Sequence, residues 1–584
     1  MPDRQLPTHI SSMISGGTKA GTAAEVVGGE SATEPSHMRA FGERVWGWVS
    51  SESLLLAVLI GSFLTRLFIA DRQSYWLDEL YAVTIHGGWN ESLQELVRVL
   101  ANITVYPPLY FVILYEWMNW LGDSEVATRL LSIIYITLAG LFLYLLLRIA
   151  FSKRIAIASV ITFNLMYTPF YYSLETRPYA QTMFLVTVSS YLLLRILRRG
   201  MQEGWRLALV SPTGSTFVVA NSALLLTHYY NAFFWVAQGL LACIFVVSAI
   251  RPRTWPKGIG CVAVLYGMQA AIFIGVWGRN LLREFGERSG PFTIAGASEL
   301  PNPFATLLDS VVAPNISMPG MVGWVALTLV VVVGVGAVSA VVRRTTSSPE
   351  RIEAWTTIYL LGWMVLPVVV LYLAFLVAGV ALYSDRYFVA SVVPLAPLLV
   401  LAVEKAAHAI ANLTGRIRGV ASDRNFSQKA WAVLLVVAAI GLMVLPQGYA
   451  AATEPKADWR GAARDIVDIV ESNVDSSYVI YEPSFRPTPL LDFYLAKYSD
   501  DVRVTGTIQR LQERRAEEDP TYKFGFERDA EVIGQFDYLI VPFMHHATGH
   551  FPIALERLME VYDLQHWGID NDGKGLAIFS IPED

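Results

Sequence analysis

Two adjacent acidic residues, Asp78 and Glu79, follow the first long apolar segment of the chain, residues 53–70. Carboxylates beside a bilayer are costly to keep, so their presence there indicates a site that uses their charge. The structural alternative is that Asp78 caps an interfacial helix, since Asp is a favoured N-cap residue and suits the positive end of the helix dipole. The pair is therefore a candidate for catalysis, with helix capping left open.

Further polar side chains occur where other apolar segments end. Arg177 and Arg386 are flanked by aromatic residues, and His228 lies beside two tyrosines. A planar guanidinium is suited to holding a phosphate, although a Glu175–Arg177 ion pair and an interfacial His228 are the structural alternatives. A carboxylate that takes a proton and cations that stabilise a leaving phosphate would together serve transfer from a lipid phosphate. The candidate binding residues are Tyr106, Glu175, Arg177, Tyr179, His228, Tyr229, Arg279, Arg386 and Tyr387.

The composition predicts a polytopic α-helical membrane protein. Of the 584 residues, 54% are hydrophobic and 16% are charged, and the mean hydropathy is +0.43. Apolar segments of about 20 residues, the length of a membrane span, recur roughly eleven times. They are residues 53–70, 127–149, 155–173, 179–197, 207–226, 229–250, 258–278, 321–343, 354–379, 386–406 and 430–447.

A net charge of −6 argues against nucleic acid as a partner. Neither cysteine, Cys243 or Cys261, suggests a disulfide framework or a zinc site.

Basic residues predict the orientation of these segments. The stretch 107–121 is too short for a confident span, and if it does not cross, every alternate loop is rich in Lys and Arg. The positive-inside rule then places the N-terminus in the cytoplasm and the first loop, residues 71–126, outside. A loop at 279–320 and everything after residue 448 are also expected outside.

Three regions follow from this reading. Residues 1–38 are predicted to be a disordered cytoplasmic tail, 39–450 a transmembrane domain, and 451–584 an extracytoplasmic α/β domain. In the last region, helical patterns at 459–471, 489–498, 508–518 and 552–561 alternate with strand-like runs at 478–481, 502–505, 538–541 and 577–581.

The motifs resemble the GT-C class of polyprenyl-phosphate-sugar glycosyltransferases, in particular family 39-like proteins related to protein O-mannosyltransferases and aminoarabinose lipid A transferases. The matching stretches are Trp76-Leu77-Asp78-Glu79, Tyr106-Pro107-Pro108-Leu109-Tyr110, Glu175-Thr176-Arg177-Pro178-Tyr179-Ala180, Thr227-His228-Tyr229-Tyr230, Asp385-Arg386-Tyr387 and Asp458-Trp459-Arg460-Gly461. The family usually has His where Tyr106 stands. The resemblance spans about residues 50 to 470 and rests on the order and common sidedness of the motifs.

This resemblance implies an inverting glycosyltransferase in the plasma membrane. A sugar would pass from a polyprenyl-phosphate donor to an extracytoplasmic glycan, lipid or protein. Asp78 would be the general base, with Glu79 orienting it or the acceptor, and Arg177, Arg386 and His228 would hold the departing phosphate. No cofactor is certain; if a divalent cation such as Mg²⁺ or Mn²⁺ is used, Asp78 and Glu79 would be its ligands, a role that competes with that of base.

Three other functions remain open from the sequence. One is a membrane anchor whose C-terminal domain binds a partner, with the charges near the membrane surface being structural. A polymerase or ligase of lipid-linked glycans would also work on a polyprenyl carrier, but one bearing a diphosphate. A transporter or flippase would have a similar number of spans, with ionisable groups near the bilayer midplane.

Overall fold

The computed structural model describes residues 52–249 apart from 89 and 105, then 254–287, 303–316, 334–338, 348–378, 385–418, short stretches between 438 and 453, 458–472, 476–480, 490–498, 504–507, 535–544, residue 559, 562–569 and 574–581. The predicted tail at 1–38 lies outside these residues, and so do most of the segments expected at 321–343 and 430–447. The helices expected at 508–518 and 552–561 lie outside them as well, apart from residue 559.

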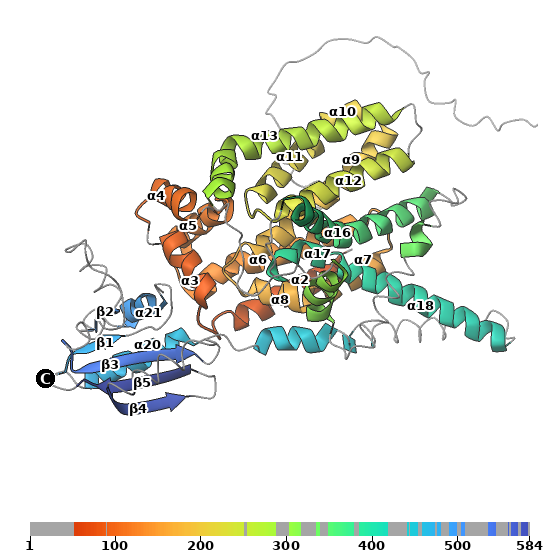
Figure 1. The fold of residues 1–584 in the computed structure, drawn as a ribbon. Coiled ribbons are helices and arrows are strands. Elements are labelled where there is room, and N and C mark those ends of the chain that lie inside the picture. The colour runs from red at the N-terminus through yellow and green to blue at the C-terminus, as the bar shows by residue number, and fades with distance from the viewer. Residues whose placement is uncertain are drawn as a thin grey trace, which may run out of the picture. The chain divides into compact units, whose positions relative to one another are not determined.

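The described part of the chain confirms a helical membrane protein. It contains five helices long and apolar enough to cross a bilayer, or six if a pair bent by 44° between Arg386 and His408 is one span. The five lie in α6 (Glu125–Leu147), α9 (Tyr179–Gln202), α12 (Asn231–Ala249), α13 (Trp255–Glu287) and α16 (Ser348–Ala378) (Figure 1). The bent pair comprises η6 (Asp385–Phe388), α17 (Val389–Val392) and part of α18 (Leu395–Arg418).

Some segments predicted as single spans are shorter or broken. The first, α2 (Ser53–Ile69), has 17 residues. The segment 155–173 forms α7 (Lys153–Leu165) and α8 (Tyr167–Ser173), and 207–226 forms α10 (Trp205–Leu209) and α11 (Pro212–Leu225). Met166 has extended backbone angles between α7 and α8, and Ser211 caps α11 with Pro212 at its first position. Pro at that position starts a helix but cannot continue the preceding one, which explains the second break.

The first loop folds into short helices. They are α3 (Leu77–Val83), η1 (Thr84–Gly88), α4 (Leu93–Val99), η2 (Leu100–Thr104) and α5 (Leu109–Leu121). With 13 residues, α5 is shorter than a membrane span, and it ends at Gly122, whose φ of 83° favours glycine. The loop expected at 279–320 begins later than predicted, because α13 continues to Glu287.

Buried polar side chains join the long helices. Gln238 of α12 donates to Ser189 Oγ of α9 at 2.9 Å and accepts from Asn221 of α11 at 2.9 Å and from Tyr266 of α13 at 2.9 Å. It also donates to Tyr359 of α16 at 3.3 Å. Hydrogen bonds between spans hold helices together where no water competes for the polar groups.

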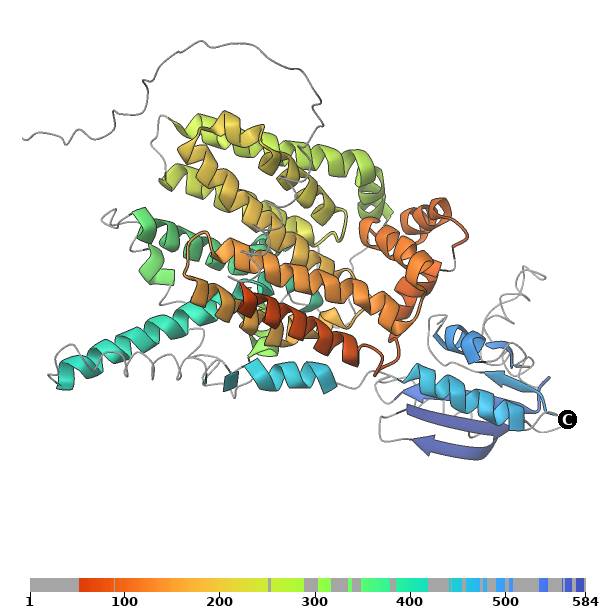
Figure 2. The same cartoon turned by 180° about the vertical axis from the view of Figure 1, so that it is seen from behind.

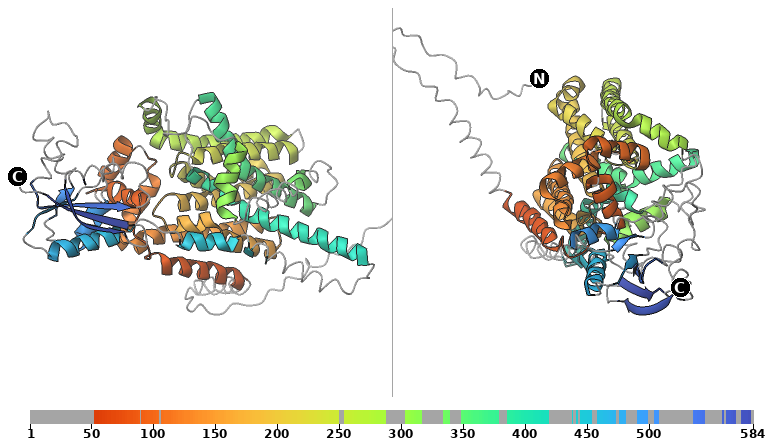
Figure 3. Two further views of the ribbon diagram at one scale, coloured as in Figure 1. Left: turned by 60° about the horizontal axis from the view of Figure 1, so that its bottom comes forward. Right: turned by 90° about the vertical axis from the view of Figure 1, so that its left-hand side faces the viewer.

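The described part of the C-terminal region contains two of the predicted helices, the four predicted strands and one strand that the sequence analysis missed. Strands β1 (Tyr478–Ile480), β2 (Val504–Thr507), β3 (Tyr538–Met544), β4 (Asp563–Ile569) and β5 (Lys574–Ser580) form one layer in the order β2-β1-β3-β5-β4 (Figures 1 and 3). β1 is parallel to β2 and β3, whereas β5 is antiparallel to β3 and β4. Helices α20 (Trp459–Ser472) and α21 (Leu490–Tyr498) pack on the face that carries Ile480, Ile540 and Ile578, and Figure 2 shows α20 along it.

Candidate active site

Asp78 lies in the first turn of α3 and is the centre of a charged cluster. Its Oδ2 forms ion pairs with Arg386 and with Nη2 of Arg177 at 3.6 Å, and its backbone carbonyl accepts from Arg177 Nη1 at 3.2 Å. Its side chain is 22% exposed, so a substrate can reach it. The structure thus unites three motifs that are up to 308 residues apart in the sequence.

Helix capping is performed by Glu79 rather than by Asp78. The N-cap residue is Trp76, whose backbone N–H donates to Glu79 Oε2 at 3.3 Å. The capping alternative for Asp78 is therefore wrong, and the Asp78 carboxylate is turned toward the two arginines.

Glu79 is a buried anchor, with 0% of its surface exposed. Its Oε1 accepts from Nε of Arg129 at 3.0 Å, and its Oε2 accepts from Nη2 of Arg129 at 2.8 Å. The backbone N–H of Thr176 also donates to Oε1 at 2.9 Å. These contacts join the first loop to α6 and to the turn that carries Arg177. Glu79 therefore positions Asp78 through the backbone.

Arg129 is a central residue that the sequence analysis missed. Besides Glu79, it donates to the backbone carbonyls of Ala70 at 2.6 Å, Gln73 at 2.7 Å and Ser74 at 3.0 Å. The available signal was a lone arginine at the start of the apolar segment 127–149, where a charge is costly without a partner.

Arg177 is held as a cation by its neighbours. Burial lowers the pKa of its guanidinium, but Tyr179, Asp78 and Tyr106 act in the opposite direction, and the net shift is upward. The guanidinium also lies over the Tyr179 ring, 5.8 Å from its centroid. Arg177 therefore keeps its charge in this buried setting.

His228 and Tyr387 form an aromatic wall beside the two arginines. The His228 ring is 5.5 Å from that of Tyr387 and 6.1 Å from that of Tyr179, and Tyr387 stacks on Tyr230 at 3.8 Å. Burial, followed by the charges of Arg177 and Arg386, lowers the pKa of His228 to about 3. Its Nδ1 accepts from the backbone N–H of Tyr230 at 3.3 Å, so the neutral ring carries its hydrogen on Nε2. Such a ring can donate a hydrogen bond without adding charge.

Tyr106 is packed against His86, a second residue that the sequence analysis missed. The His86 ring is 5.5 Å from Tyr106 and 4.9 Å from Phe111, and only 4% of the residue is exposed. Within the described residues, neither ring nitrogen of His86 has a hydrogen-bond partner. Burial and the charge of Arg177 lower its pKa to about 3, against an opposing effect of Asp78. No pattern in the sequence distinguishes this histidine.

The other three candidate residues are a tyrosine with a partner on α13, an exposed arginine and a buried glutamate. Tyr229 accepts a hydrogen bond from Trp277 Nε1 of α13 at 2.9 Å, and Arg279 is exposed on α13. Glu175 is fully buried, and its backbone carbonyl accepts from Ser132 at 2.6 Å. Tyr106, Arg177, Tyr179, His228, Arg386 and Tyr387 remain as the residues gathered near Asp78.

Arginine side chains pair with both carboxylates that the sequence offered as ligands for a divalent cation. Both carboxylate oxygens of Glu79 are engaged by Arg129, and the Asp78 carboxylate faces two guanidinium groups. The described residues contain no group of three or more His, Cys, Asp or Glu that could hold a metal ion. Cationic side chains, not metal ligands, surround the candidate base.

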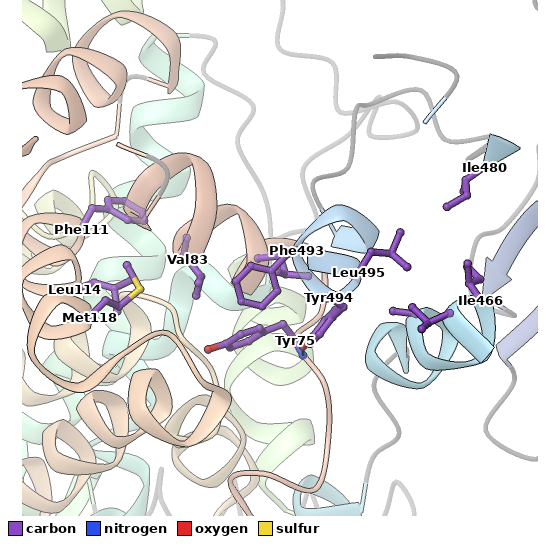
Figure 4. Packing of buried hydrophobic residues seen from close by; sticks show 14 of the residues in the cluster. Tyr75, Val83, Phe111, Leu114, Met118, Ile466, Ile480, Phe493, Tyr494 and Leu495 are labelled. Carbon is purple, nitrogen blue, oxygen red and sulfur yellow. Dashed lines mark hydrogen bonds between the residues drawn. The ribbon is translucent and has the colours of Figure 1, made fainter. Parts of the chain in front are cut away.

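The first loop is held by the C-terminal α/β region. The Tyr494 hydroxyl accepts from the backbone N–H of Tyr75 at 2.8 Å and donates to Glu125 Oε1 at 2.7 Å. Arg460 pairs with Asp71 at 2.9 Å, and Lys497 pairs with Asp123 at 3.0 Å. Figure 4 shows Tyr75 beside Phe493 and Tyr494, in one hydrophobic cluster with Val83 and Met118. The strand-helix region therefore supports the segment that carries Asp78.

Comparison with solved structures identifies the fold. The chain is similar to apo ArnT from Cupriavidus metallidurans, with a TM-score of 0.50 and 12% identity, over 92% of this chain and 99% of that chain. It also matches the oligosaccharyltransferase of Archaeoglobus fulgidus, with a TM-score of 0.45 and 14% identity, over 92% of this chain and 75% of that chain. No curated protein matches the sequence.

The ArnT-like fold and the family match of one segment agree with the GT-C class that the sequence motifs implied. Residues 105–277 match the PMT_2 family, described as dolichyl-phosphate-mannose-protein mannosyltransferase. Through this segment the chain is similar to the PMT_2 family.

Proposed function

We propose that the chain transfers a sugar, with inversion, from a polyprenyl monophosphate to an acceptor outside the cytoplasm. The observation that carries this proposal is the pairing of the Asp78 carboxylate with Arg177 and Arg386. One anion and two cations at a partly exposed position are what a carboxylate base and a phosphate leaving group require.

The two arginines would exchange one anion for another when the donor binds. Asp78 pairs with both of them in the ligand-free chain, and a phosphate carries a stronger set of acceptor oxygens for planar guanidinium groups. Once Arg177 and Arg386 move to the phosphate, the Asp78 carboxylate becomes free to accept a proton. Donor binding would thereby activate the base.

In the chemical step, the acceptor hydroxyl oxygen forms a bond to the anomeric carbon of the sugar. Its proton passes to the Asp78 carboxylate, and the bond between that carbon and the phosphate oxygen breaks with its electron pair on the oxygen. Arg177 and Arg386 stabilise the charge that develops on the polyprenyl phosphate, and Nε2–H of His228 is a candidate donor to the same group. Attack from the side opposite the phosphate gives inversion.

The acceptor would be a glycan, lipid or protein of the cell envelope, met on the outer side of the plasma membrane. Support comes from the Lys- and Arg-rich alternate loops, which favour a cytoplasmic N-terminus. Asp78, Arg177 and Arg386 lie at the ends of apolar segments, on the side of the membrane opposite to these basic loops.

The test is mass spectrometry of lipids that co-purify with the full chain. Asp78→Asn removes the proton acceptor at nearly constant volume, so a polyprenyl monophosphate sugar should accumulate on this variant relative to wild type. Arg177→Ala together with Arg386→Ala should abolish that accumulation. Arg154→Ala, an exposed arginine of α7, is the matched control and should behave as wild type.

Two results would contradict the proposal. A diphosphate-linked glycan on Asp78→Asn would favour the polymerase or ligase. Unchanged sugar transfer by Asp78→Asn, with no such lipid bound, would remove Asp78 as the base and favour a transporter.

A further inference from the structure

A cavity of about 260 Å³ lies between α9, α12 and α16, far from Asp78 along the helices. Most of its wall is apolar, including Leu194 and Leu197 of α9 and Leu241 and Phe245 of α12. Arg198 at its rim is 19 residues after Tyr179, which corresponds to about 28 Å along a helix axis. The cavity is therefore separate from the candidate active site.

The rim of this cavity is cationic. Arg198 and Arg351 line it, and neither forms an ion pair or a hydrogen bond with the residues that the structure describes. An adjoining cavity of about 380 Å³ shares Ile149 and Arg198 and is also lined by Arg148, Arg195, Arg199 and Glu203. Arg199 is neutralised by Glu203 at 2.7 Å, which leaves an excess of positive charge at the mouth.

One lining residue, Trp355, also carries a buried hydrogen-bond donor. Trp355 of α16 is 9% exposed, and its indole N–H has no acceptor among the residues that the structure describes. A donor left without an acceptor costs free energy, and the other groups near it in the cavity wall are mainly apolar. An acceptor oxygen on a bound molecule would remove that cost.

We propose that this cavity binds an anionic phospholipid of the membrane. One acyl chain would lie against the leucines, the phosphate would lie between Arg198 and Arg351, and an ester oxygen would accept from Trp355. Basic pockets between transmembrane helices suit anionic headgroups, and the apolar wall excludes a soluble anion as the preferred occupant. The ligand differs from the sugar donor, since the site is at the other end of α9.

Native mass spectrometry with added phosphatidylglycerol or phosphatidylcholine tests the site on the full chain. Wild type should retain phosphatidylglycerol in preference to phosphatidylcholine. Arg198→Ala with Arg351→Ala should weaken that retention by about 25-fold, because each basic residue near a membrane surface contributes about fivefold. Arg154→Ala with Arg206→Ala removes two exposed arginines that do not line this cavity, and should retain the lipid as wild type does.

A second variant separates the tail from the headgroup. Met201→Trp places a bulky side chain at the partly exposed mouth without changing the charge, and should also reduce phosphatidylglycerol retention. Equal retention by all variants would overturn the proposal. Competition between inorganic phosphate and phosphatidylglycerol would also overturn it. So would an arginine variant that loses bound undecaprenyl phosphate but retains phosphatidylglycerol.

Discussion

At the scale of single residues, two neighbouring carboxylates have opposite environments. Asp78 is partly exposed and faces Arg177 and Arg386, while Glu79 is fully buried against Arg129. The family resemblance implied that Asp78 is the base and that Glu79 orients it or the acceptor. The residue types alone could not divide the roles, because the division depends on which side of α3 meets α6. The candidate base, Asp78, and its anchor, Glu79, are consecutive residues of α3.

Glu79→Gln should destabilise the folded chain. Removing one partner of a buried ion pair leaves Arg129 uncompensated, which costs about 3–5 kcal/mol. Thermal unfolding in detergent should show a clearly lower midpoint for Glu79→Gln than for Asp78→Asn, which alters a partly exposed group. Equal midpoints for Glu79→Gln and wild type would mean that Glu79 does not anchor the loop.

His86 should make stability depend on pH. Its pKa is about 3 in the folded chain and about 6.5 when unfolded, so below pH 6.5 the unfolded state binds a proton that the folded state does not. Stability should therefore be unaffected above pH 7 and fall as pH drops from 6.5 toward 3, by up to about 1.4 kcal/mol per pH unit.

The check is the unfolding midpoint of wild type and His86→Phe at pH 7 and pH 5. His86→Phe should lose less stability on acidification, since Phe cannot take up a proton, while His228 is present in both chains. Identical losses would contradict the assignment of this pH dependence to His86.

At the scale of elements, the first loop is held between α6 and the C-terminal α/β region. Tyr494 of α21 contacts both Tyr75 and Glu125, and Arg460 of α20 contacts Asp71 and lies 3.6 Å from Glu125. The role of this region was unpredictable from the sequence. Its contacts with the loop depend on tertiary packing, for which hydropathy and periodicity carry no signal.

Tyr494→Phe combined with Arg460→Ala should loosen the loop. These changes remove a hydrogen bond to the Glu125 carboxylate and the Arg460 ion pair, and hydrogen bonds to charged groups contribute about 1.5–3 kcal/mol each. Amide hydrogen exchange of residues 71–80 should become faster. Gln565→Ala, at an exposed site on β4, is the control and should leave that exchange unchanged.

Other elements were predicted to different degrees. The alternation of apolar and polar residues predicted α20, α21, β1 and β3 closely, because one face of each packs in a core. Strand β4 was missed, since Asp563–Ile569 mixes polar and apolar residues. Hydropathy located the long helices but not the breaks at Met166 and Ser211, where local backbone conformation decides.

At the scale of the whole molecule, orientation stays a prediction. In a background with Cys243→Ala and Cys261→Ala, Arg154→Cys and Gln565→Cys each introduce one exposed thiol. If the N-terminus is cytoplasmic, a membrane-impermeant maleimide should label intact cells only through Gln565→Cys, because Arg154 lies in a basic segment at the start of α7. Labelling of Arg154→Cys alone would reverse the orientation.

The hydrogen bond between Tyr75 and Tyr494 joins residues 419 positions apart. A ribosome therefore completes the first loop long before it makes the residues that hold it. A nascent chain would keep its Asp78 carboxylate loosely placed until the segment around Tyr494 has been translated. If a chain that ends after residue 453 retained the polyprenyl lipid as tightly as the full chain, this timing would not limit maturation.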